Sequence, residues 1–178
     1  MKIISHTLRS LILCASVGIL AGCATATKPE SMVATTAETL TRHAQTVAVS
    51  TVGGRDTSAA GKSQIADAAF AQGLIASIEK TKVFSAVVQG AVANYTLSVA
   101  IVSMDQPSFG LSFTVKMETA WTLKKADGSI AWQDVIKAEN TATTSDAFVG
   151  TERLRIATEG AARKGIEAGL AKISKLTL

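Results

Sequence analysis

The chain has 178 residues, of which 47% are hydrophobic, 18% charged and 4% aromatic. This length fits one domain with an extension, and the apolar fraction, with only two prolines, excludes wholesale disorder. The net charge of +4 includes Lys2 and Arg9, which lie in a segment that we expect to be removed, and the small remainder gives no reason to expect nucleic acid as a partner.

The first 23 residues have the organisation of a secretory signal. Lys2 and Arg9 provide a positive start, and an apolar stretch from Leu11 to Leu20 follows that is too short to cross a bilayer as a helix. The segment ends in Leu20-Ala21-Gly22-Cys23, which resembles the lipobox of bacterial lipoproteins. The alternative is an ordinary signal peptide that ends on a cysteine by chance.

The lipobox resemblance implies that residues 1–22 are cleaved off and that Cys23 receives a diacylglycerol on its thiol and an acyl chain on its amine. Two or three such chains anchor a protein firmly in a membrane. In this family the residue after the cysteine directs sorting, and Ala24, where an aspartate would retain the protein in the inner membrane, implies an outer-membrane protein facing the periplasm. Cys14 would leave with the signal peptide and Cys23 would be a thioether, so neither a disulfide nor a thiolate metal site is expected.

Residues 23–43 are expected to form the lipidated cysteine and a flexible tether, and residues 44–178 a single periplasmic domain. The tether is rich in alanine and threonine, contains Pro29 and shows no clear periodicity. Fully extended, it would let the domain stand clear of the membrane. His43, at the end of the tether, is expected to be solvated.

Three elements are predicted in the first part of the domain. Alternating valines predict a strand over residues 45–52, which Gly53-Gly54 ends. Apolar residues at every fourth position predict a helix over residues 63–81, with Ser63 as its N-terminal cap. A short apolar run over residues 83–88 predicts an edge strand.

The clearest alternation, from 95 to 101 and from 111 to 124, predicts antiparallel strands with one buried and one wet face. Asp127-Gly128 then predicts a two-residue hairpin turn. This turn would place Leu123 opposite Trp132 and Trp121 opposite Asp134. In that register four residues of the following strand lie on the buried face: Ile130, Trp132, Ile136 and Ala138.

The last predicted element is a helix that begins between Asp146 and Thr151 and ends near Lys175. Small residues form the centre of its apolar stripe, while Arg153 and Lys164 are predicted to project from the opposite side. The order of elements predicts an α+β fold, a two-layer sandwich with two helices packed on one face of a mainly antiparallel sheet of four or five strands. This order, together with the lipobox, resembles small YajG-type envelope lipoproteins and the periplasmic domain of the curli secretion pore.

The sequence offers little catalytic chemistry. Gly61-Lys62-Ser63 looks like the end of a P-loop, but the first glycine of that motif would fall at Asp56, so we interpret it as an ordinary loop. His43 would be the only histidine of the mature chain, which argues against a nucleophile activated by a histidine base. No cofactor and no metal site is expected.

Two charged residues are candidates for a binding role. Asp134 interrupts the apolar face of its strand opposite Trp121, which either reflects function or is explained by a β-bulge or by a hydrogen bond from the indole. Arg155 lies near the border of the buried helical stripe. Its guanidinium is expected either to reach solvent, with its stem buried, or to pair with Asp134.

Two loops are candidates for contact with a partner, because loops carried by a rigid scaffold often bear function. The segment from Asp105 to Gly110 contains Pro107 and Phe109, and the segment from Thr144 to Gly150 contains Phe148. The alternative is that these aromatic side chains cap the end of the core.

Three functional hypotheses follow. The first is a non-enzymatic outer-membrane lipoprotein whose periplasmic domain binds another envelope protein, through a sheet edge or through the wet sheet face. The second is an enzyme that uses carboxylates such as Asp134 on a cell-envelope substrate, which requires a cleft holding two carboxylates or an acid and a cation. The third, suggested by the resemblance to the pore domain, is an accessory subunit of a ring-forming envelope complex.

Overall fold

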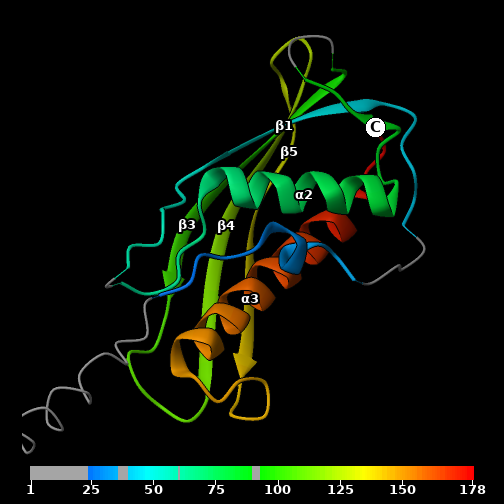
Figure 1. Cartoon of the computed structure of the whole chain (residues 1–178). Coiled ribbons are helices and arrows are strands. Elements are labelled where there is room, and N and C mark those ends of the chain that lie inside the picture. The colour runs from blue at the N-terminus through cyan, green and yellow to red at the C-terminus, as the bar shows by residue number, and fades with distance from the viewer. Residues whose placement is uncertain (1–23, 36–39, 60, 90–92) are drawn as a thin grey trace, which may run out of the picture.

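A five-stranded mixed sheet with two α-helices on one face makes up the part of the chain that the computed structural model describes, residues 24–35, 40–59, 61–89 and 93–178 (Figure 1). The order of the strands across the sheet is β2-β1-β3-β4-β5. β1 pairs in parallel with β2 and β3, and β3, β4 and β5 form an antiparallel meander. The strands are β1 (Thr46–Val52), β2 (Ala86–Val87), β3 (Tyr95–Asp105), β4 (Phe113–Lys125) and β5 (Ile130–Ala142). The predicted α+β class is therefore confirmed, whereas the predicted signal peptide and Cys23 lie outside the described residues.

The helices α2 (Asp67–Thr81) and α3 (Gly150–Ile173) lie on the same face of the sheet, α2 against β1 and β2 and α3 against β4 and β5. The start of α3 falls within the predicted range. α2 begins later than predicted because Ser63 does not cap it. The Ser63 hydroxyl instead donates a hydrogen bond to the carbonyl of Thr25 at 2.8 Å, and the first helical residue is Asp67.

The hairpin between β4 and β5 has the predicted register over most of its length. Leu123 pairs with Trp132 and Trp121 with Asp134. Near the turn the prediction is wrong in one detail, because the register shifts between Leu123 and Lys124 and leaves Ala131 as an extra residue. This bulge places Ile130 opposite Lys124, so Ile130 is exposed rather than buried.

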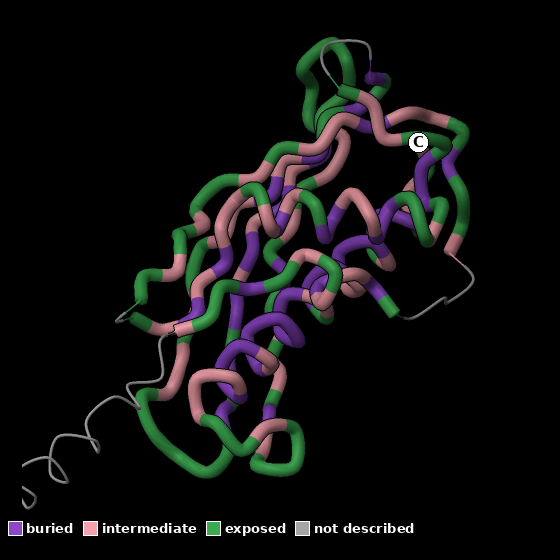
Figure 2. Tube along the Cα trace, in the orientation of Figure 1, coloured by how far each residue is buried: buried purple, intermediate pink, exposed green. Residues whose placement is uncertain are grey.

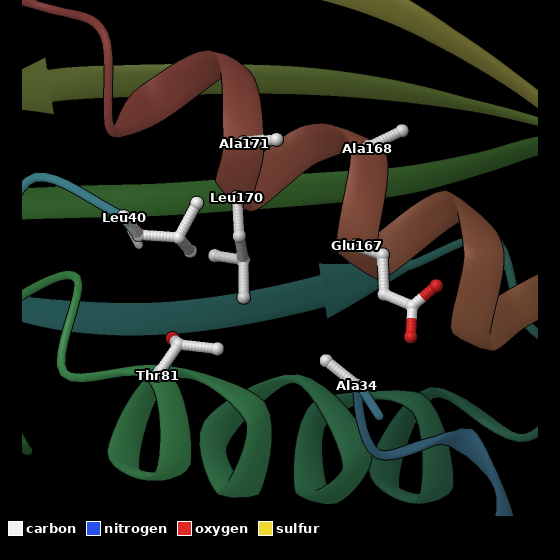
Figure 3. A pocket seen from close by; sticks show the side chains of 7 residues that line it. All are labelled: Ala34, Leu40, Thr81, Glu167, Ala168, Leu170 and Ala171. Carbon is white, nitrogen blue, oxygen red and sulfur yellow. The ribbon is translucent and has the colours of Figure 1, made fainter. Parts of the chain in front are cut away.

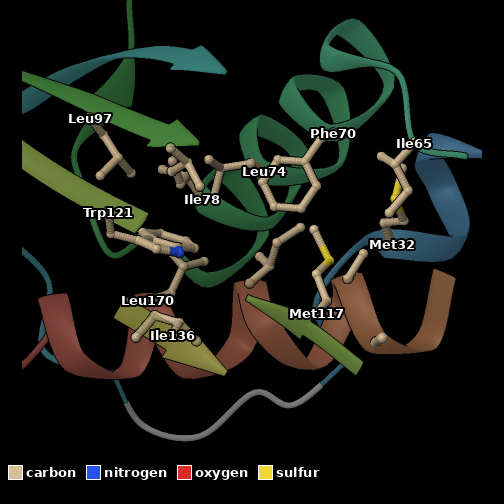
Figure 4. Close-up of a cluster of buried hydrophobic side chains, with 14 of the residues drawn as sticks. Met32, Ile65, Phe70, Leu74, Ile78, Leu97, Met117, Trp121, Ile136 and Leu170 are labelled. Atoms are coloured by element: carbon tan, nitrogen blue, oxygen red, sulfur yellow. The ribbon is translucent and has the colours of Figure 1, made fainter. Parts of the chain in front are cut away.

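A single hydrophobic core lies between the sheet and the helices, and Trp121, Phe70 and Met32 are among its largest fully buried side chains (Figure 4). The alternation along β4 is the predicted one from Phe113 onward. Leu111, which was expected to be the first inward residue, is instead 80% exposed because β4 begins only at Phe113.

The segment expected to be a flexible tether is part of the domain wherever the structure describes it. Residues 24–35 run along α2 and α3, and the short 3-10 helix η1 (Pro29–Met32) contacts both of them (Figure 1). The Met32 side chain is fully buried, and the Lys28 amide donates to the Glu159 carboxylate at 2.7 Å. The tether prediction is therefore wrong for residues 24–35, because η1 packs against both helices.

His43 is buried rather than solvated. Its Nε2 atom lies 3.0 Å from the carbonyl oxygen of Ile173, and its ring lies against Phe84 with 5.7 Å between the ring centroids. The Ile173 carbonyl, at the end of α3, also accepts the Leu176 amide at 3.0 Å, so His43 adds a side-chain contact to a carbonyl that already has a backbone partner. His43 therefore has a structural explanation that the sequence did not indicate.

Two glycines of α3 provide a matched test of how closely the helix lies on the sheet. A Cβ atom at Gly169 would come within 2.5 Å of the Trp121 ring, whereas a Cβ at Gly165 would meet only the Cβ of Ala138, at 3.7 Å. We expect Gly169→Ala to lower the free energy of unfolding by about 1–3 kcal/mol through overpacking. Gly165→Ala should leave it unchanged or raise it by up to about 1 kcal/mol, because alanine favours helix. Urea denaturation of both variants checks this, and equal stabilities would contradict the close packing.

Candidate functional site

Two loops meet at one end of the sheet and carry large exposed apolar side chains. Residues 106–112 connect β3 to β4, residues 143–149 connect β5 to α3, and both lie at the lower end in Figures 1 and 2. Phe109 is 88% exposed and Phe148 is 91% exposed, and Leu111 and Val149 are exposed beside them in sequence. We call these two loops the loop end. Neither phenylalanine caps the core, so that alternative is wrong.

Arg153, in the first turn of α3, holds the two loops together. Its guanidinium donates to the carbonyls of Ala147 at 2.9 Å and Phe148 at 2.8 Å in one loop, and to the carbonyl of Gly110 at 3.2 Å in the other. The guanidinium also lies over the Phe113 ring, 5.1 Å from its centroid, in a cation–π contact. Arg153 was expected on the solvent side of α3 and is instead buried, because both loops fold over it.

The loop 143–149 is further ordered by its own hydrogen bonds. The Asp146 carboxylate accepts bonds from the Thr143 amide at 2.7 Å and from the Thr143 hydroxyl at 3.0 Å. These bonds lower the pKa of Asp146 below its ordinary value. Phe148 is therefore presented to solvent by a loop whose backbone is held on both sides of it.

A surface hollow of about 280 Å³ adjoins the loop end. The Lys62 ammonium group donates to the carbonyl of Gln106 at 2.6 Å, so it holds the base of the first loop. The hollow is lined by residues from four separated segments, including Ala24, Lys62, Pro107, Ser108, Gly150 and Leu154. Ala24, the first described residue of the chain, is thus a neighbour of the loop end.

Arg155 is buried in a cluster of charges on α3. Its guanidinium forms ion pairs with Glu152 and with Glu159, the latter at 2.6 Å. The hydrogen bonds with Glu152 raise the pKa of Arg155 above its ordinary value and lower that of Glu152. The expected alternatives, a solvated guanidinium or a pair with Asp134, are both wrong, because two carboxylates of its own helix surround Arg155.

Asp134 lies opposite Trp121, as predicted, and pairs with Lys172 of α3 at 2.6 Å. This hydrogen bond is the main cause that lowers the pKa of Asp134. No bulge occurs at this position, and the Trp121 indole donates to the Thr119 hydroxyl at 2.8 Å rather than to Asp134. Asp134 and Arg155 are therefore separate ion pairs and do not form a common site.

A second hollow, of about 210 Å³, lies between the end of α2 and the last turns of α3 (Figure 3). Its lining is mainly apolar and includes Leu40, Thr81 and Leu170. One carboxylate, that of Glu167, points toward the N-terminal segment, where it accepts a hydrogen bond from the Thr35 amide at 2.7 Å. The residues that line this hollow thus provide one carboxylate and no cation, and not the two carboxylates, or the acid and the cation, that the enzyme hypothesis requires.

The face of the sheet away from the helices carries a row of apolar side chains. Register places these residues side by side across four strands, and the outer two are exposed by half or more. The row is Val52, Ala100, Ala120 and Val135. Polar residues border it, including the ion pair of Lys137 with Glu118 at 2.8 Å. We call this surface the open sheet face.

Neither a metal-binding cluster nor a membrane-spanning helix is found among the described residues. Among these residues no group of three or more histidine, cysteine or acidic side chains is placed to hold a metal ion. In the same part of the chain, no helix has the length and apolar character needed to cross a bilayer.

Comparison with known proteins shows similarity in fold. The DUF330 protein XCC0632 from Xanthomonas campestris matches with a TM-score of 0.64 at 14% identity, over 84% of this chain and 94% of that one. The hypothetical protein CT253 from Chlamydia trachomatis matches with a TM-score of 0.53 at 9% identity, over 74% and 98%. An uncharacterised lipoprotein B from Nitrosomonas europaea matches with a TM-score of 0.48 at 14% identity, over 75% and 84%. No family model and no curated protein sequence matches the chain.

Proposed function

We propose that this protein is an outer-membrane lipoprotein whose periplasmic domain binds another envelope protein and performs no catalysis. The proposed anchor is Cys23, on the strength of the lipobox Leu20-Ala21-Gly22-Cys23. The observation that carries the binding role is the open sheet face. The two helices cover the other face of the sheet. The row from Val52 to Val135 instead forms a continuous apolar strip that is exposed to solvent and bordered by charged residues.

The shape and chemistry of this face favour a protein partner. An apolar centre with a polar rim is the usual anatomy of a protein interface. β5 is in addition an edge strand, so its outer backbone groups are available to a partner strand. Asp134, the carboxylate considered for catalysis, is engaged by Lys172.

Photocrosslinking in cells tests this proposal. Benzoylphenylalanine placed at Ala120, in the middle of the open sheet face, is expected to form an adduct with an envelope protein. The same group at Glu79, exposed on α2 in the opposite layer, should form none. Val135→Arg should remove the Ala120 adduct, since it introduces a charge into the apolar row.

Further results test the lipid anchor and the separate partner independently. Intact mass of the membrane-extracted chain should begin at Cys23 and include acyl chains, whereas Cys23→Ser should yield a protein without them. An unacylated wild-type chain would contradict the anchor. An Ala120 adduct that contains only a second copy of the chain would contradict a separate partner and indicate self-assembly, the third of the hypotheses above.

A further inference from the structure

We infer that the loop end docks on the phospholipid surface of the membrane that holds the lipid anchor, with Phe109 and Phe148 inserted at the level of the headgroups. This inference rests on the proposed lipidation of Cys23. It adds an orientation to the anchor, because a lipid chain alone holds a protein at a membrane without fixing which side faces it.

The position of Ala24 supports this assignment. Ala24 lines the same hollow as Pro107 and Ser108 of the first loop and Gly150 beside the second. Its amide is also fixed to the domain by a hydrogen bond to the carbonyl of Ala59 at 3.1 Å. Ala24, the residue that follows the proposed anchor, is therefore held next to the loop end. The acyl chains and the exposed phenylalanines therefore start from the same side of the molecule.

The tips of the loops have the composition that a membrane interface requires. The two loops, residues 106–112 and 143–149, contain only one charged side chain, that of Asp146, whose carboxylate is bound by Thr143, in a chain of which 18% is charged. They carry four exposed apolar side chains, those of Phe109, Leu111, Phe148 and Val149. Charged groups are costly to bring into a membrane, whereas apolar side chains beside polar loop atoms are favourable at the boundary between headgroups and acyl chains.

The loops are also held ready for insertion. Arg153 bonds to carbonyls of both loops, so one buried cation fixes the two tips relative to each other. The guanidinium is shielded by the Phe113 ring and by the loops themselves. Insertion of the tips therefore requires neither a new backbone conformation nor the burial of a free charge.

Fluorescence quenching in vesicles tests the inference with the full lipidated chain. Because the thiol of Cys23 would be occupied, an introduced cysteine is a unique labelling site. Single variants Phe109→Cys, Phe148→Cys and, as a control, Ala126→Cys at the opposite hairpin are labelled with a polarity-sensitive nitrobenzoxadiazole dye. The proteins are reconstituted in vesicles of phosphatidylethanolamine and phosphatidylglycerol that contain nitroxide lipids.

We expect a blue-shifted emission and severalfold stronger quenching at positions 109 and 148 than at Ala126, greatest with a nitroxide near the headgroup. A chain that floats with the vesicles but shows equal quenching at all three positions overturns the loop docking and leaves the anchor intact. A wild-type chain that does not float overturns the anchor and the docking together. Crosslinking of position 109 to a protein in cells, without lipid quenching, would also overturn the docking, since it would assign the loop end to a protein partner.

Discussion

Replacement of Arg155 by alanine is expected to lower the free energy of unfolding by about 3–5 kcal/mol, because it leaves a buried carboxylate without its counter-charge. The exposed fractions of the Arg155 and Glu159 side chains are 8% and 4%. Glu159 also accepts the Lys28 amide, so the cluster fastens the N-terminal segment to α3. Chemical denaturation of the full chain measures the loss.

Two comparisons separate this effect from a general loss of packing. Arg155→Met combined with Glu159→Leu should lose much less stability, because a buried pair replaced by apolar groups leaves no isolated charge.

Acidification should also narrow the difference in the free energy of unfolding between wild type and Arg155→Ala. The pKa of Glu152 is lowered in the folded state, so its contribution is present above its ordinary value of 4.5 and is lost as the pH falls through the folded value. A difference that does not depend on pH down to acid unfolding would contradict the role of Glu152.

Met32→Ala is the second large effect that we expect, a loss of about 2–5 kcal/mol, the range for removing a long apolar side chain from a core. Met32 is 0% exposed, and it packs so closely on α2 that a Cβ atom added at Gly73 would come within 3.1 Å of the Met32 Cβ. Thermal unfolding followed by circular dichroism measures the change.

The matched control for Met32→Ala is Glu30→Ala, an exposed position of the same short helix η1. This variant should change stability by less than about 0.5 kcal/mol, as surface substitutions usually do. If Met32→Ala and Glu30→Ala were equally stable, residues 24–35 would behave as the free tether that their composition suggests, and their packing on α2 and α3 would be disproved.

Much of the sheet could be predicted because its signals are local. Alternation with a period of two identifies a half-buried strand wherever it occurs, and a hairpin turn sets the register of the strands on either side. Leu123 and Trp132 therefore pair as predicted. The bulge at Ala131 could not be predicted, because it corrects a turn that is longer than the two residues expected from Asp127-Gly128.

The candidate site residues could likewise be predicted only where their signal is local in the sequence. Phe109, Pro107 and Phe148 were predicted as loop residues from turn composition, and an antiparallel meander necessarily brings the ends of β3 and β5 to one side. The role of Arg153 left no signal in the sequence, since its partners are backbone carbonyls, which every residue has. Arg155 and Glu159 stand four residues apart, a spacing that does indicate a helical ion pair and that was overlooked.

By itself, the sequence determined the α+β class and the hairpin register, because each depends on residues that are neighbours along the chain. Only the tertiary structure decided that residues 24–35 belong to the domain and that Ala24 lies beside the loop end. The first depends on contacts of η1 with both α2 and α3, two helices far apart in sequence, and the second on contacts of Ala24 with Ala59 and with the two loops. An aperiodic segment rich in alanine and threonine carries no local sign of such contacts, so its burial follows from packing and not from its own pattern.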